Sequence, residues 1–263
     1  MNKKIVQNDQ NKEKNSKFKM SSNNLKPLVK TEIMGVGITN ASKSIILEYL
    51  NNFINKSAKK MYIVTPNPEM IVFAAKNEEF KKALNHAQIA LCDGVGLYLA
   101  AKFFGKNLKE RVTGISLMES ICEMVNEKPI TVGFLGGRLG VAEDASECLK
   151  KRYPNLKVKF TGSEWRDFEA SEKKSLDILF IAFGVPKQEL FMMNNLGKLP
   201  VRVMVGVGGA FDQIVNPTLR PPKIIDAIGF GWLYRLIRQP WRWKRQLALI
   251  EFIKLMIKFK FES

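Results

Sequence analysis

The stretch "MYIVTPNPEM", residues 61–70, indicates the fold within ten positions. Met61 to Val64 form a short apolar run that is typical of a buried strand. Asn67 is a strong helix N-cap, and Pro68 suits the first helical position, where its missing N–H costs nothing. This stretch therefore predicts a buried strand that turns directly into a capped helix.

The same strand–helix unit recurs along the chain. Further apolar runs of strand length are "TEIMGVGI" (31–38), "QIALCD" (88–93), "ITVGFLG" (130–136), "LKVKFTG" (156–162), "DILFIAFG" (177–184) and "VRVMVGVGG" (201–209). Amphipathic helical stretches separate most of them. The pattern predicts a Rossmann-like α/β fold, with a mostly parallel sheet and helices on both faces. Right-handed crossovers would place all carboxyl ends of the strands at one edge, where such sheets bind ligands.

Charge divides the chain into three parts. The formal net charge is +17, and residues 1–30 and 232–263 each carry eight basic residues against two acidic ones. We expect residues 1–30 to be a disordered basic extension, residues 31–215 to form the α/β catalytic core, and residues 216–263 to form a helical appendage. The basic charge therefore belongs mainly to the two ends.

The appendage combines arginines with tryptophans. Arginines at helical spacing would share one face if Pro240 only kinks the helix: Arg235, Arg238, Arg242 and Arg245. Three tryptophans accompany them: Trp232, Trp241 and Trp243. A basic, Trp-bearing amphipathic helix fits an anionic membrane surface, which we favour. The alternative is a terminal helix that packs on the core with a solvated basic face.

Composition disfavours several classes of protein. The three cysteines are widely spaced without a CxxC pair, so neither a disulfide framework nor structural zinc is expected. The expected compartment is a reducing cytosol. His86 is the only histidine and is expected on the surface, which leaves little for His-centred catalysis. The N-terminus lacks the apolar core of a signal peptide, and no apolar run reaches the ~20 residues of a membrane span.

Polar residues and glycines gather after five of the predicted strands. Thr65 and Asn67 follow one strand, Asp93 the next, and Gly136–Gly137, "FGVPKQE" and "GVGGAFD" follow three others. Any one turn needs glycine and capping residues for structural reasons alone. Five together predict one composite site at the sheet edge. Asp93 is either a helix N-cap or a base that faces a pocket, and spacing alone does not decide between them.

The sequence indicates how the site would bind a diphosphate. It contains no complete GxGxxG, no GxxxxGK[ST] and no Asp-x-Asp, and the acidic pair Asp167/Glu169 lies in an apparent polar linker. A diphosphate would then be neutralised by arginines, lysines and helix N-termini rather than by a Mg²⁺ clamp, so neither a metal nor a cofactor is expected. Arg111, Lys187 and the tail arginines could supply the charge, and Gly136 and Gly137 could offer backbone N–H groups.

The chain resembles the WecG/TagA/CpsF family of bacterial glycosyltransferases. The resemblance rests on "TPNPEM", "LCDGVGL", "ERVTGISLM", "GFLGG", "AFGVPKQE" and "GVGGAFD", in this order. It covers roughly residues 31 to 245. Several independent motifs in one order are more specific than any one of them.

This resemblance implies an activity and a site. Family members transfer N-acetylmannosamine or a related sugar, with inversion and without a metal, from a UDP-sugar to polyprenyl-diphosphate-linked N-acetylglucosamine. They work as peripheral proteins at the cytoplasmic face of the plasma membrane, in the synthesis of teichoic acid, enterobacterial-type antigen or capsule. The resemblance implies that Asp93 is the general base. It also implies that the pocket is lined by Thr65, Asn67, Arg111 and Gln188, and that the arginines closing over the diphosphate are Arg235, Arg242 and Arg245.

Two other classes of function compete with this one. A charge of +17 suggests a nucleic-acid-binding protein, although the charge is terminal and no recognition motif occurs. The glycine turns suggest a nucleotide-dependent oxidoreductase, which would bind NAD(P). We expect no nucleic acid among the partners, and the sequence leaves a homo-oligomer open.

Overall fold

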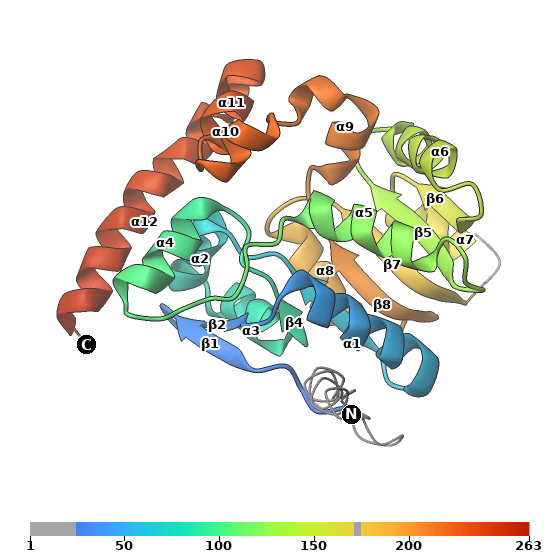
Figure 1. Ribbon diagram of the computed structural model, residues 1–263, viewed down its shortest axis with the longest axis horizontal. Coiled ribbons are helices and arrows are strands. Elements are labelled where there is room, and N and C mark those ends of the chain that lie inside the picture. The colour runs from blue at the N-terminus through green and yellow to red at the C-terminus, as the bar shows by residue number, and fades with distance from the viewer. Residues whose placement is uncertain (1–24, 171–174, 263) are drawn as a thin grey trace, which may run out of the picture.

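The computed structural model describes residues 25–170 and 175–262, and it has a six-stranded sheet at its centre (Figure 1). The strand order is β4-β3-β8-β7-β5-β6, and every pairing in this sheet is parallel. The strands are β3 (Met61–Val64), β4 (Ile89–Ala90), β5 (Thr131–Gly136), β6 (Lys157–Gly162), β7 (Leu176–Ala182) and β8 (Val201–Gly206). The predicted α/β class is confirmed.

Helices cover both faces of this sheet. Successive residues of β3 enter different clusters of buried side chains: Met61 and Ile63 join one, and Tyr62 and Val64 join the other. The first cluster includes side chains of α1 (Lys43–Lys56), α5 (Gly114–Val125), α6 (Val141–Arg152) and α9 (Ala210–Val215). The second includes side chains of α2 (Pro68–Lys76), α3 (Glu78–His86), α4 (Val95–Phe103) and α8 (Lys187–Asn195).

The stretch 31–38 is not the single strand that its apolar pattern predicts. It contributes to an antiparallel hairpin of β1 (Lys30–Ile33) and β2 (Val36–Thr39), outside the main sheet. Met34 and Gly35 both have positive φ, 48° and 77°, and two such residues form the tight turn that suits a hairpin. The prediction for this stretch was wrong because the turn lies inside an otherwise apolar run.

Two further expectations have different outcomes. His86 is exposed at the end of α3, as predicted. Asp167 and Glu169 lie in helix α7 (Trp165–Ala170) rather than in a linker.

The basic extension, residues 1–30, falls largely outside the described residues, although Leu25 and Leu28 pack against the core and Lys30 begins β1.

The C-terminal segment consists of several helices rather than one kinked helix. After the 3₁₀ turn η1 (Pro217–Leu219) come α10 (Lys223–Ala227), α11 (Gly231–Arg238), η2 (Pro240–Arg242) and α12 (Trp243–Glu262). Pro240 opens η2 and separates α11 from α12, so the four arginines do not share one helix face as predicted. No helix among the described residues is long and apolar enough to cross a membrane.

Helix α12 contacts the core directly. It packs along α2, and Phe252 is buried in the second cluster with 2% of its surface exposed. Lys76 on α2 and Glu251 on α12 form an ion pair with an Nζ–Oε2 distance of 2.5 Å. In Figure 1 α12 runs along one side of the molecule past α2 and α4. The C-terminal segment therefore forms part of the wall around the sheet edge.

Candidate active site

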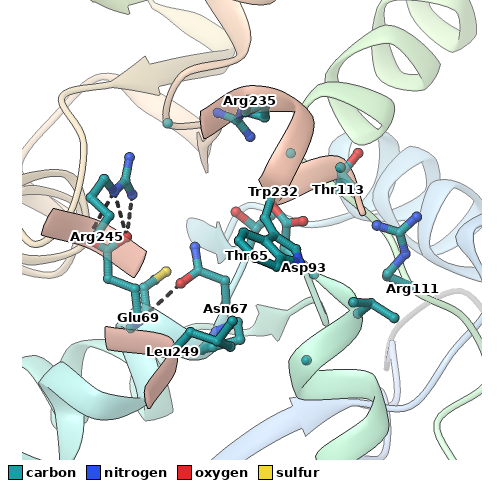
Figure 2. Close-up of a pocket in the computed structure, with 18 of the residues that line it drawn as sticks. Thr65, Asn67, Glu69, Asp93, Arg111, Thr113, Trp232, Arg235, Arg245 and Leu249 are labelled. Atoms are coloured by element: carbon teal, nitrogen blue, oxygen red, sulfur yellow. Dashed lines mark hydrogen bonds and ion pairs between the residues drawn. The ribbon is translucent and has the colours of Figure 1, made fainter. Parts of the chain in front are cut away.

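A pocket of about 830 Å³ opens at the carboxyl edge of the sheet. This volume is in the usual range for a site that binds a small molecule. Residues that follow four neighbouring strands line it: Thr65 after β3, Asp93 after β4, Gly184 after β7 and Val207 after β8. The C-terminal segment also lines the pocket, through Arg235, Arg242 and Arg245. Figure 2 shows Arg235 and Arg245 at this wall. The site thus joins two distant parts of the sequence.

The turn after β3 has the geometry that its sequence predicts. The Asn67 side-chain oxygen accepts a hydrogen bond from the Met70 N–H at 3.0 Å, and Pro68 is the first residue of α2. The buried Thr65 hydroxyl donates to the Gly206 carbonyl at 3.4 Å and so ties the turn to β8. Since only the oxygen of Asn67 is needed for the cap, its amide nitrogen can face the pocket (Figure 2).

Helix α4 begins beside the start of α2. A Cβ on Gly96 would lie 2.9 Å from the Pro68 ring, so only glycine allows this approach. Gly94 is the N-cap of α4 and has no side chain to cap the first turn. The third helix at the pocket, α5, is capped by Thr113, whose hydroxyl accepts from the Ser116 N–H at 3.2 Å. Three helix N-termini meet here, and each favours a negatively charged group.

Asp93 faces the pocket and is not the cap of α4. Its own N–H donates to the Pro66 carbonyl at 2.8 Å, which fixes the backbone beside the turn after β3. Gly94 occupies the cap position and Asp93 lines the pocket, so the pocket-facing alternative holds. Burial raises the pKa of Asp93 to about 6, although Arg235, Arg111 and a hydrogen bond from the Gly114 N–H oppose the rise. This carboxyl can therefore exchange a proton near neutral pH.

Arg111 links the core to the C-terminal segment. Its guanidinium donates to the two carboxylate oxygens of Asp226 at 3.3 and 2.5 Å, and to the Asp226 backbone carbonyl at 3.1 Å. Two-pronged arginine–carboxylate pairs hold both partners in a defined orientation. The sequence does not single out Asp226, because nothing local predicts a partner 115 positions away.

Three more arginines concentrate positive charge at the pocket. Arg245 pairs with Glu69 through Nε–Oε2 at 2.8 Å, and the Arg242 guanidinium donates to Gln239 at 3.1 Å. Burial lowers the pKa of Arg235. Burial together with Arg235 and Arg245 lowers the pKa of Arg242 to about 10. Since burial and repulsion from neighbouring arginines both disfavour the charges of Arg235 and Arg242, an anion that enters between them would stabilise these charges.

Gln188 forms hydrogen bonds with the loop after β8 and with the buried carboxyl group of Glu189. Its side-chain oxygen accepts from the Gly208 N–H at 3.0 Å, and its amide donates to Glu189 at 2.5 Å. Glu189 is fully buried, and burial raises its pKa to about 8, so it is mostly protonated at neutral pH. Sequence reasoning missed Glu189, because its neutral, buried state depends on packing rather than on its place in "FGVPKQE".

Eight of the sequence-predicted site residues line one pocket: Thr65, Asn67, Asp93, Arg111, Gln188, Arg235, Arg242 and Arg245. Gly136, Gly137 and Lys187 do not line it. Gly136 ends β5 and Gly137 follows it, and β5 lies beyond β7 from the site. The Gly137 N–H already donates to the Ala182 carbonyl at 3.1 Å. Lys187 is exposed, whereas Gln188 beside it is buried.

The fold and the pocket define a class of enzyme. One carboxyl group that forms no ion pair among the described residues, together with arginines and helix N-termini at the edge of a parallel sheet, suits transfer of a group away from a diphosphate. The chain matches the profile of the Glycosyl transferase WecG/TagA/CpsF family over residues 31–263, and it belongs to that family. The resemblance in the motifs is thereby confirmed, and the protein is a glycosyltransferase rather than an oxidoreductase or a nucleic-acid-binding protein.

Named relatives cover nearly the whole chain. A protein of Bacillus spizizenii is 29% identical over 238 residues, 89% of this chain and 91% of its own length. A Bacillus subtilis protein is 26% identical over 86% of this chain and 90% of its own. A Staphylococcus aureus protein is 29% identical over 82% of this chain and 86% of its own length. All three are named N-acetylglucosaminyldiphosphoundecaprenol N-acetyl-beta-D-mannosaminyltransferase.

The raised pKa of Asp93 predicts a pH-dependent effect on stability. A carboxyl whose pKa rises on folding from 3.8 to about 6 destabilises the folded state once it ionises. We expect Asp93→Asn to increase the free energy of unfolding by about 1–3 kcal/mol at pH 7.5 and by little at pH 4. Urea denaturation at the two pH values measures this difference.

The matched control is Asp144→Asn, which removes an exposed carboxylate of α6 that does not line the pocket. It should change stability by no more than about 0.5 kcal/mol at either pH. A destabilised Asp93→Asn at pH 7.5 would contradict the environment described for Asp93.

Proposed function

We propose that this enzyme transfers N-acetylmannosamine, or a closely related sugar, from a UDP-sugar to polyprenyl-diphosphate-linked N-acetylglucosamine, with inversion at the anomeric carbon. The product would serve the synthesis of a cell-envelope polysaccharide such as teichoic acid. The relatives' names and the family support the substrates. The observation that carries the mechanism is the pocket-facing carboxyl of Asp93, which forms no ion pair among the described residues and lies near Arg235 and Arg111. The other two carboxyls that line the pocket, Glu69 and Asp226, are each paired with an arginine.

The chemistry needs one base and a stabilised leaving group. The acceptor hydroxyl attacks the anomeric carbon as the bond to the UDP oxygen breaks, and Asp93 takes the hydroxyl proton. The electron pair of the broken bond leaves with UDP, whose diphosphate gains negative charge. Attack from the face opposite to UDP inverts the anomeric configuration. A pKa of about 6 leaves Asp93 ionised and still basic at neutral pH.

The arginine cluster suits the leaving diphosphate. Glu69 holds Arg245 and Gln239 holds Arg242, while Arg235 lies near Asp93. Charge that is positioned in advance needs little rearrangement in the transition state. The N-termini of α2, α4 and α5 add backbone N–H groups to the same pocket. Gln188 would support substrate binding by holding Gly208, which lines the pocket, through its hydrogen bond. Thr65 and Asn67 would supply polar contacts to the sugars.

The C-terminal segment also suits a membrane surface. It exposes large apolar side chains, among them Ile237 and Trp241, each 71% exposed, and Phe261, 87% exposed. Basic side chains such as Arg238 and Lys254 are exposed beside them. A surface that mixes tryptophan with cations binds anionic lipid. We propose that the enzyme is peripheral on the cytoplasmic face of the plasma membrane, where it meets its lipid-linked acceptor.

The catalytic proposal predicts a selective loss in one variant. Asp93→Asn should lower kcat about 10²–10⁴-fold, because the base is lost while the pocket keeps its shape. Binding of UDP, followed as a thermal shift, should stay close to that of the wild type. Turnover is measured with UDP-N-acetylmannosamine and a prenyl-diphosphate-N-acetylglucosamine acceptor. The control Asp144→Asn should retain full turnover, and near-normal turnover by Asp93→Asn would exclude Asp93 as the base.

The membrane proposal predicts lipid-selective binding. Wild-type protein should sediment with vesicles that contain anionic lipid and not with neutral vesicles, and added salt should weaken the binding. The double variant Ile237→Ser/Trp241→Ser should lose most of this binding. Leu139→Ser, at an apolar position after β5 that is 92% exposed, should keep this binding. Equal binding by the double variant and the wild type would contradict a membrane role for this surface.

A further inference from the structure

The pocket continues from Asp93 into an apolar groove between α4 and α12. The groove is lined by Leu99, Ala100 and Phe103 on α4 and by Leu249, Ile253 and Met256 on α12. Leu99, Phe103 and Ile253 are 55%, 46% and 47% exposed, so the groove is open to solvent along part of its length. Nothing in the transfer of the sugar itself requires these side chains.

The spacing of these residues makes the groove a regular feature of two helices. Leu249, Ile253 and Met256 stand four and three residues apart, which places them on one face of α12. Leu99 and Phe103 are four residues apart on α4, and Ala100 lies between them. Each helix thus turns an apolar stripe toward the other, and the stripes line a channel instead of closing into a packed interface.

Contacts at the two ends define the path of the groove. Near the active site, a Cβ on Gly96 would lie 3.7 Å from the Leu249 side chain, so α4 and α12 approach each other closely there. At the far end, the Lys260 ammonium lies 5.8 Å from the centre of the Phe103 ring. The seven residue-to-residue steps from Gly96 to Phe103 span roughly 10 Å of helix. The groove therefore follows α4 from its start, two residues after Asp93, to its end at Phe103. Figure 1 shows α12 passing beside α4.

We propose that this groove holds the first isoprene units of the lipid-linked acceptor, those next to its diphosphate. The inference rests on the proposed function, which supplies an acceptor with a sugar, a diphosphate and an apolar chain in this order. In the pocket the first turns of α2 and α4 lie between Asp93 and the groove: Gly94, the cap of α4, follows Asp93, and Gly96 approaches both Pro68 and Leu249. The acceptor diphosphate would lie at these two helix N-termini, and the arginine cluster would remain with the leaving UDP diphosphate. Burying the chain between α4 and α12 would cover side chains that are otherwise exposed to water.

The exit of the groove fits the remainder of the chain. Ile257 and Phe261 extend the apolar surface of α12 past the far end of the groove. They have 45% and 87% of their surfaces exposed. A long prenyl chain could therefore pass from the groove into a bilayer without crossing a polar surface. An occupant drawn from the membrane, such as a lipid acyl chain, would lack the link to the diphosphate and would not affect acceptor recognition.

The test compares two acceptors that share the same head group. Both carry N-acetylglucosamine diphosphate, one on a single five-carbon isoprene unit and the other on three isoprene units, assayed in detergent without vesicles. We expect the wild type to have a lower KM for the longer acceptor. Leu99→Gln should raise the KM for the longer acceptor about tenfold or more, since a polar group cannot replace the lost apolar contact. Its KM for the shorter acceptor and its thermal shift with UDP should not change.

Leu247→Gln is the matched control, because Leu247 is 51% exposed on α12 and does not line the pocket. It should leave both KM values unchanged. The proposal is overturned if the wild type does not distinguish the two acceptors, if Leu99→Gln affects both equally, or if Leu247→Gln has the same effect as Leu99→Gln.

A binding experiment separates this inference from the proposed function. Failure of the wild type to transfer sugar to either acceptor would contradict the proposed function. In that case, calorimetric titration with farnesyl diphosphate, which has the apolar chain but no sugar, tests the groove alone. Binding by the wild type that weakens about tenfold in Leu99→Gln supports the groove, and equal binding by both proteins overturns it.

Discussion

The site depends on the balance between the burial of the Asp93 carboxyl and its attraction to Arg235 and Arg111. Its carboxyl lies where β4 ends and where α2, α4 and α5 begin, and burial raises its pKa to about 6. An ordinary surface aspartate, with a pKa near 3.9, would be a much weaker base at neutral pH. Arg235 and Arg111 limit the rise and keep the carboxyl ionised under working conditions. A charge that destabilises the fold is thus retained where chemistry requires it.

This environment exists only because the C-terminal segment packs against the sheet edge. Arg235 comes from α11, Asp226 from α10 holds Arg111, and Arg245 of α12 pairs with Glu69 of α2. Phe252 anchors α12 in the core. The same segment exposes the apolar and basic surface that we assign to the membrane, so one structural element would connect lipid, acceptor chain and catalytic carboxyl.

Local signals in the sequence predict much of the fold and part of the site. Asn67 and Pro68 specify a helix start, and apolar runs specify strands whose carboxyl ends must meet at one edge. The sequence does not reveal which strands are neighbours, and for that reason Gly136 and Gly137 looked like site residues although β5 lies too far along the sheet. Nor does it reveal the turn at Met34, the break at Pro240, the Asp226 partner of Arg111 or the protonated Glu189. These depend on pairings between distant segments or on packing.

The dependence of kcat/KM on pH tests the central claim most directly. If Asp93 is the base, activity should rise through one ionisation near pH 6 and level off above about pH 7. In Arg235→Gln the midpoint should move to higher pH, because the positive charge that favours the ionised carboxyl is lost. A wild-type profile that stays level down to pH 5 would contradict the assignment of Asp93 as the proton acceptor.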